Sequence, residues 1–366
     1  MRRNLFALAF LTFAGATGVI HADIAYADEA SASKMPEAGV KADGWYVSGD
    51  VAWQAVNLPD YGLGFRKVTN PIFSDGGTFQ SLDQHLDGYR LQGTVGYFLP
   101  PALSDTLMGA NTRVEFVGRY GRATGGETGI VDFTDGGVAR LMLDGTGANA
   151  GYVCSIGQVC HVASNVSAEH SDWQIGGRIA GEYRVDQILL TPSLTLFGGE
   201  TRTDQAMAQV LQLGAHPELS FYTADTSLRS TDYGLRAGVD LKFDVTPVVS
   251  LGLGGSAGLA RRHTSFDGTD IINDTLFGIL TGTGTASGSD NATPFVANTE
   301  VSLTYKWLPA LAMRGFAGVD YDSKVAGIAA PDFGGVVGGV TTRTPARVSF
   351  HSELGFYAGG GITWSF

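Results

Sequence analysis

The sequence has little of what soluble nucleic-acid-binding proteins and helical membrane proteins depend on. Basic residues (24) are outnumbered by acidic ones (36), for a formal net charge of -12. This balance argues against a nucleic-acid partner, because phosphate contacts need clustered positive charge. Beyond residue 20, no apolar run reaches the roughly 18 residues of a membrane-spanning helix. Both classes are therefore excluded, and the 44% of hydrophobic residues must be distributed in another way.

Cysteine is almost absent, with 2 residues in the whole chain, Cys154 and Cys160. In an exported protein, two cysteines this close in a polar, Gly-rich stretch predict a local disulfide that ties a loop. A metal site needs more ligands than His161, the only one nearby. We therefore predict a disulfide, no metal and no cofactor.

The N-terminus predicts export. Two arginines at positions 2–3 precede an apolar run at 5–20, and Ala25-Tyr26-Ala27 places small residues around a cleavage site. The run is short and broken by glycine, which does not suit a membrane anchor. We predict a signal peptide at 1–27 that is cleaved off, followed by a periplasmic segment at 28–43.

The rest of the chain alternates between apolar and polar residues. In the first such segment Trp45, Val47 and Trp53 share one face, whereas Ser48 and Asp50 share the other. A long strand that is apolar on one side suits a wall between lipid and a polar lumen. The pattern predicts ten antiparallel strands in an up-and-down transmembrane β-barrel, at 45–54, 89–99, 113–120, 172–184, 188–197, 232–243, 249–259, 295–307, 311–321 and 347–366.

The last of these strands carries a family resemblance. Its apolar face runs from Phe350 through Leu354 and Trp364 to Phe366, with His351 and Glu353 on the other face. A terminal Phe on such a strand resembles the assembly signal of the Gram-negative outer-membrane β-barrel superfamily. The resemblance implies an outer-membrane location and recognition of the last strand by the barrel-assembly machinery.

The links between the strands are alternately short and long. Long links are expected as extracellular loops at 57–84, 123–169, 201–229, 264–291 and 323–344. The second could hold a further hairpin, from 129–133 and 138–143, which would give twelve strands. Aromatic residues predicted at the membrane interfaces, in contact with lipid and lipopolysaccharide, are Trp45, Trp53, Tyr97, Trp173, Tyr183, Tyr233, Tyr305, Trp307, Trp364 and Phe366.

The lumen face carries charges of both signs, which are expected to pair because an unpaired charge in a confined interior is costly. The predicted charge network comprises Asp50, Arg90, Arg113, Glu115, Arg119, Arg178, Glu182, Arg236, Asp240, Lys242, Glu300, Arg314 and Glu353. Small residues at 250–256 could instead leave a water path or make room for a loop. A wide diffusion pore is not expected.

Three functions remain open. The first is a structural or adhesive surface protein, or a narrow channel for small solutes, with an extracellular ligand that stays unknown. The second is a specific or gated porin with a loop folded inward. The third is a hydrolase at the extracellular rim, where His170, Asp172, His85, Asp83, Asp87, His263 and Asp320 are expected. No local motif marks a catalytic site, so we predict that the protein is not an enzyme.

Overall fold

The alternating segments form long antiparallel strands. The computed structural model describes residues 44–63, 65–68, 80–107, 111–133, 136–140, 142–145, 152–154, 159–185, 187–213, 219–274, 280–331, 336–337, 340–341 and 344–366. The predicted signal peptide at 1–27 and the predicted periplasmic segment at 28–43 lie outside these residues.

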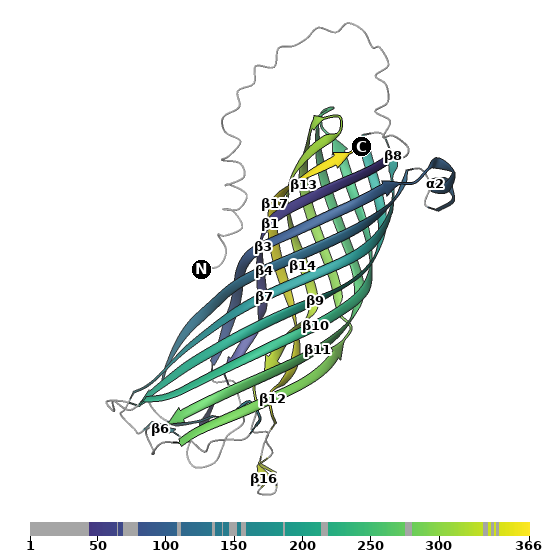
Figure 1. Cartoon of the computed structure of the whole chain (residues 1–366). Helices are drawn as coiled ribbons and strands as arrows, with labels where there is room; N and C mark the ends of the chain where they lie inside the picture. Colours follow the sequence, from purple (N-terminus) through teal and green to yellow (C-terminus); the bar gives the residue numbers. More distant parts are fainter. Residues whose placement is uncertain are drawn as a thin grey trace, which may run out of the picture. The chain divides into compact units, whose positions relative to one another are not determined.

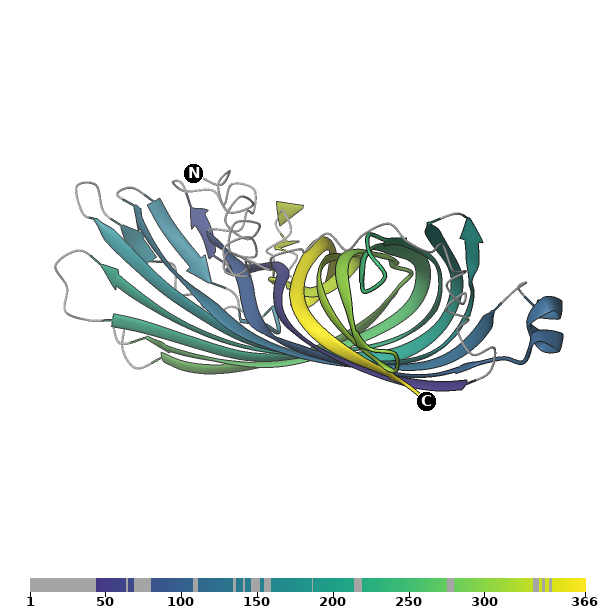
Figure 2. The ribbon, with the colours of Figure 1, turned by 90° about the horizontal axis from the view of Figure 1, so that it is seen from above.

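Ten strands close into a ring. They are β1 (Gly44–Leu63), β3 (Gln80–Phe98), β4 (Thr112–Phe133), β7 (Cys160–Gly181), β9 (Ile188–Leu213), β10 (Leu219–Asp244), β11 (Val249–Asp274), β13 (Phe295–Leu308), β14 (Leu311–Ala329) and β17 (Arg347–Ser365). Neighbours pair antiparallel, and the ring closes because β1 pairs with β17 and β9 with β10. Figures 1 and 2 show these strands curving around a common axis. The predicted antiparallel barrel is confirmed.

The remaining elements are short extensions or lie outside the ring. β8 (Tyr183–Val185) adds pairs to β9, and β12 (Leu280–Ala292) continues the pairing of β11 beyond β13. β2 (Phe65–Val68), β5 (Gly136–Arg140) and β6 (Tyr152–Cys154) form a separate sheet, and β15 (Val336–Val337) pairs with β16 (Val340–Thr341). The further hairpin expected from 129–133 and 138–143 is not part of the described ring, because 129–133 belongs to β4 and β5 pairs with β2 and β6.

One end of the barrel, here called the near end, has short links and holds Gly44 and Phe366. The Phe366 N–H donates to the Trp45 carbonyl at 3.0 Å. The links here are helix α2 (Pro101–Leu107) with its flanks, the bends at 245–248 and the turn at 309–310. No helix in the described part of the chain is long and apolar enough to cross a membrane.

A belt of exposed apolar side chains surrounds the half of the barrel next to the near end. Val51 is 60% exposed, Phe116 58% and Leu196 67%, all on the outer face. Exposed belts of this kind require a hydrocarbon environment. The predicted interface aromatics Trp45, Trp53, Trp173, Tyr183, Tyr233, Tyr305, Trp307, Trp364 and Phe366 are exposed on the outside, and Tyr97 is half-buried against Trp45 with ring centroids 4.9 Å apart.

The strands continue far beyond this belt to the other end, here called the far end. β9, β10 and β11 have 26 residues each, whereas a membrane crossing needs about 9–11. Figure 1 shows β4, β7, β9, β10 and β11 continuing towards the lower left. The strands extend into each of the expected loops at 57–84, 123–169, 201–229, 264–291 and 323–344, and in 201–229 and 264–291 they take up most of the residues, so the loops begin later and end earlier than expected.

The alternation pattern did not predict the extension, because its apolar side chains point into the barrel and not outward. In the belt, β10 turns Tyr233 and Leu235 outward, but in the extension it turns Tyr222 and Leu228 inward, where both are buried. Fourteen buried residues fill the barrel interior there: Leu82, Met142, Leu143, Val162, Val166, Met207, Tyr222, Ala224, Leu228, Phe266, Ile272, Ile328, Ala346 and Val348. The far half is thus built like a water-soluble barrel with an apolar core.

A register shift in β14 changes one further assignment. The pairing between β14 and β17 shifts between Asp322 and Val325, and beyond it Val348 and Phe350 pack on the buried apolar cluster. The sequence pattern placed Phe350 on the outer face with Leu354. That placement is wrong, because the irregularity interrupts strict alternation.

Candidate functional site in the barrel interior

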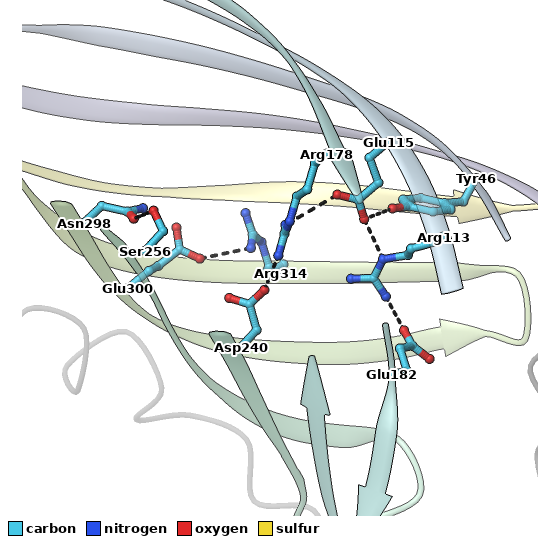
Figure 3. Close-up of polar contacts among 10 residues, drawn as sticks. All are labelled: Tyr46, Arg113, Glu115, Arg178, Glu182, Asp240, Ser256, Asn298, Glu300 and Arg314. Carbon is cyan, nitrogen blue, oxygen red and sulfur yellow. Dashed lines mark hydrogen bonds and ion pairs between the residues drawn. The ribbon is translucent and has the colours of Figure 1, made fainter. Parts of the chain in front are cut away.

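Glu115 is the centre of the ion-pair network next to the near end. Its side chain is 3% exposed, accepts a hydrogen bond from the Tyr46 hydroxyl, and pairs with Arg113 at 2.5 Å and with Arg178 at 3.5 Å. Arg113 also pairs with Glu182, and Figure 3 shows these side chains converging from β1, β4 and β7. Several donors thus compensate one buried carboxylate, as a buried charge requires.

Two further groups of ion pairs lie along the same lumen. Arg314 bridges Asp50 at 2.9 Å and Glu300 at 3.0 Å, and the Tyr357 hydroxyl donates to Glu300 at 3.3 Å. Arg178 pairs with Asp240 at 2.5 Å. These links join strands that are distant in sequence, so they form only when the ring closes.

The middle of the lumen holds a third set of charges. Arg90 pairs with Asp320 at 2.7 Å, and Arg119 pairs with Asp172 at 2.9 Å. Ten of the thirteen predicted network residues thus have ion-pair partners. The other three, Arg236, Lys242 and Glu353, have no such partner among the described residues, although all three line the lumen cavities.

Arg262 was not predicted, although it organises the charges nearest the far end. Its guanidinium is 7% exposed and pairs with Asp232 at 2.5 Å and with Asp322 at 2.8 Å. It also donates to the Lys324 carbonyl at 2.5 Å. Arg262 lies just beyond the apolar belt, where the expected strand had already ended. The continued alternation of β11 is the signal that could have identified it.

Two adjoining cavities occupy the lumen between these charges. The near cavity is about 380 Å³ and the far cavity about 180 Å³. Six residues line both: Arg90, Arg119, Gln174, Phe197, Arg236 and Tyr357. Gly252, Gly254 and Ser256 of the small-residue stretch line the near cavity, and a Cβ at Gly254 would collide with the Asp240 carboxylate. The small residues of this stretch therefore leave part of the cavity open and also make room for the side chain of Asp240.

Residues 142–145, here called the plug segment, lie inside the far half of the barrel among the buried apolar side chains. Met142 and Leu143 are buried in the apolar cluster. The Leu143 N–H donates to Asp270 Oδ2 at 2.8 Å, and the Ala346 N–H donates to the Leu143 carbonyl at 2.8 Å. Gly145 has φ +75, and a Cβ there would lie 3.1 Å from the Pro345 nitrogen, so the turn requires glycine.

The walls around the plug segment are shaped to receive it. A Cβ at Gly268 would lie 2.9 Å from Leu143 Cδ1, and one at Gly282 would lie 3.4 Å from Met142 Sδ. Asp270 lies on β11 and is 1% exposed. In addition to the Leu143 N–H, it accepts a hydrogen bond from the Tyr222 hydroxyl at 3.0 Å. The plug segment therefore occupies a fitted position, as a turn that is not part of the strand ladder of the wall.

The rim residues of the hydrolase hypothesis divide into two groups: His170, Asp172 and Asp320 line the far cavity, whereas Asp83, His85, Asp87 and His263 are exposed on the outer side. His170 and Asp172 point inward, and Asp172 is engaged by Arg119. His85 and His263 are exposed on the outer side, where each contacts an asparagine, Asn57 at 2.7 Å and Asn291 at 3.0 Å. The predicted disulfide also stays a prediction, because the side chains of Cys154 and Cys160 lie outside the described part.

His170 makes stability depend on pH. It lies beyond Trp173 on the far side of the belt, with Nδ1 3.0 Å from Thr203 Oγ1. Burial lowers the pKa of its imidazole; Asp172 opposes this, whereas Arg119 and Arg262 lower the pKa further. When the pH decreases below the ordinary His pKa of about 6.5, the unfolded chain therefore binds more protons than the folded one. The free energy of unfolding falls as a result.

We expect the unfolding free energy to drop between pH 8 and pH 5.5, and the drop to be smaller in His170→Gln. Denaturant titrations at both pH values measure it. His85→Gln, at an exposed histidine, should retain the full wild-type dependence. Equal pH dependence in wild type and His170→Gln would contradict the assignment.

Solved structures with a similar strand arrangement are β-barrels of outer membranes. They include the outer membrane protease OmpT from Escherichia coli (9% identity, 88% of this chain and 97% of that chain covered, TM-score 0.41). Others are an outer membrane channel from Pseudomonas putida F1 (10%, 88% and 96%, TM-score 0.27) and a FadL homologue from Pseudomonas aeruginosa (7%, 88% and 90%, TM-score 0.21). No protein-family profile and no curated protein matches the sequence. The likeness concerns the strand arrangement alone.

Proposed function

We propose that the protein is a narrow outer-membrane channel for small solutes, closed by its plug segment. The observation that carries this proposal is the interior itself. Two adjoining polar cavities lead from the near half towards the plug segment, whose Met142 and Leu143 join the apolar cluster that fills the barrel there. Residues 142–145 form a turn outside the strand ladder, and such a turn is the kind of element that opens locally while the strands stay paired.

The ends of the barrel support an orientation. The near end has short links and holds both ends of the ring, whereas the far end carries the strand extensions. Short turns on the periplasmic side and longer elements outside are typical of bacterial barrels. We therefore propose that the near end faces the periplasm, that lipid and lipopolysaccharide contact the belt, and that the last strand is read by the assembly machinery.

Asp270→Ala tests the channel. The substitution removes the acceptor of the Leu143 N–H and of the Tyr222 hydroxyl, and an unsatisfied buried donor costs about 1–3 kcal/mol. That cost disfavours the seated plug segment. In planar bilayers we expect the wild-type barrel to be closed most of the time and Asp270→Ala to show frequent discrete openings.

Asp267→Ala is the matched control, because Asp267 lies on the same strand but is exposed on the outer face. It should behave as wild type. Folding of each variant is checked by the heat-dependent shift in its electrophoretic mobility. A folded Asp270→Ala barrel that never conducts would overturn the channel, and a wild type that conducts as steadily as the variant would overturn closure by the plug segment.

A further inference from the structure

Arg236 is a half-buried cation of the lumen without an ion pair. In the described part of the chain no carboxylate lies within ion-pair distance of its guanidinium, and its Nε is buried without a hydrogen-bond partner. Its Cζ lies 4.2 Å from the centroid of the Phe197 ring, which covers one face of the group. Such a position is costly for a charge unless a counter-ion compensates it.

Four aspartates that line the far cavity together with Arg236 are already engaged by other arginines, whereas Glu353, at the same cavity, has no ion pair among the described residues. Asp320 pairs with Arg90 and Asp172 with Arg119, both around the same cavities. Further towards the far end, Asp232 and Asp322 both pair with Arg262. The group formed by Arg90, Arg119 and Arg236 with its two aspartates therefore keeps one positive charge in excess.

Among the charged residues that line the cavity on the near side of Arg236, cations predominate. Seven basic side chains and two acidic ones line it: Arg90, Arg113, Arg119, Arg178, Arg236, Lys242 and Arg314 against Asp240 and Glu300. Lys242 projects from the same face of β10 as Arg236 and likewise has no carboxylate within ion-pair distance among the described residues. Two unpaired cations thus stand along one wall, one towards the near end and one where the two cavities meet.

We propose that Arg236 binds a small oxyanion, a carboxylate or a phosphate, where the near and far cavities adjoin. A planar guanidinium presents parallel N–H groups that match two oxygens of one such anion. The near cavity, at about 380 Å³, has room for a small organic acid. The binding site stands independently, but its assignment to the transported solute rests on the proposed channel.

Binding is tested on the purified full-length barrel in neutral detergent. Inorganic phosphate and acetate are titrated separately at pH 7 and constant ionic strength, with calorimetry as the readout. We expect both anions to bind wild type, Arg236→Gln to weaken binding at least about tenfold, and Arg236→Lys to retain part of it. Binding of only one anion would identify which of the two classes the site takes.

Arg202→Gln is the control, because Arg202 is an exposed arginine of β9 that already pairs with Asp204 at 2.9 Å. It should bind the anions as wild type does. No binding to folded wild type overturns the site, whatever the variants do, and unchanged binding in folded Arg236→Gln overturns the role of Arg236. If Arg236→Gln fails to fold, Arg236→Lys and wild type still decide the question.

The solute assignment is tested in the Asp270→Ala background. Under a salt gradient the reversal potential should indicate preference for anions, and adding Arg236→Gln should move it towards zero. An unselective current from a barrel that binds no anion would support the channel and contradict the anion-binding site. Anion binding without any current from folded Asp270→Ala would support the anion-binding site and contradict the channel.

Discussion

Replacing Glu115 by glutamine is expected to lower the free energy of unfolding by about 3–5 kcal/mol, the cost of breaking a buried ion pair by removing one partner. Glu115 is 3% exposed and faces Arg113 and Arg178 from one position in the lumen. Glutamine keeps the shape but loses the charge. Both arginines then remain buried with one carboxylate fewer, and the Tyr46 hydroxyl loses its charged acceptor.

Glu169→Gln is the matched control for this variant. Glu169 also pairs with an arginine, Arg122 at 2.8 Å, but both side chains are about half-exposed on the outer wall. Exposed pairs contribute about 0–1 kcal/mol. Urea titrations of barrels refolded into vesicles measure both changes. A Glu115→Gln effect no larger than that of Glu169→Gln would show that the network contributes nothing special to stability.

A double-mutant cycle separates the pair from its surroundings. In the double variant Glu115→Gln with Arg113→Gln, the second substitution removes one of the cations that the first leaves uncompensated. The double variant should therefore cost less than the sum of the single ones. Strict additivity would mean that Arg113 and Glu115 do not interact, despite the 2.5 Å separation of their charged atoms.

The membrane-spanning half could be read from alternation because each side of its strands meets a different solvent. Trp45 and Trp53 are exposed on the outside of β1, whereas Asp50 and Gln54 are buried inside. The far half also alternates with period two, but there the apolar side chains point inward and the polar ones outward. Phe266 and Ile272 are buried, and polar residues of β11 such as Asp267 and Thr269 are exposed. A search for apolar residues on the lipid side therefore ends where the strand leaves the belt.

The lumen charges were predictable as a set but not as partners. Period-two alternation is a local property, and it places Asp50 and Arg314 on the inner face without reference to the rest of the chain. Their 2.9 Å pairing joins residues 264 positions apart, and it depends on how β14, β17 and β1 align around the ring. The sequence also cannot show that Arg236 has no ion-pair partner among the described residues, because this depends on which arginines pair with the nearby carboxylates in the folded barrel.

The plug segment was the least predictable part of the interior. Met142 and Leu143 precede the turn residues Asp144 and Gly145, and the pattern alone resembled a short strand. What seats them inside is the space left by glycines of β11 and β12, Gly268 and Gly282 among them. A fitted cavity is a property of two distant segments together, so neither segment indicates it alone.

Val239→Arg tests the position of the lipid belt most directly. Val239 is on the outer face of β10, 44% exposed, and close to the midpoint between Tyr233 and Phe243. At about 3.3 Å per residue and a tilt of about 40°, that stretch spans about 25 Å, the height of an apolar barrel band. An arginine at the centre of such a band costs about 2–4 kcal/mol of folding free energy.

Thr223→Arg places the same charge on the outer face of the same strand, but in the far extension, where the neighbouring outward residue Asp225 is polar and exposed. In water an exposed substitution changes stability by less than about 0.5 kcal/mol. Equilibrium unfolding in vesicles should therefore separate the two variants clearly. Equal effects would mean that the belt from Tyr233 to Phe243 does not lie in lipid. The separation expected here follows from the reversal of polarity along β10, because one strand faces hydrocarbon in its near half and water in its far half.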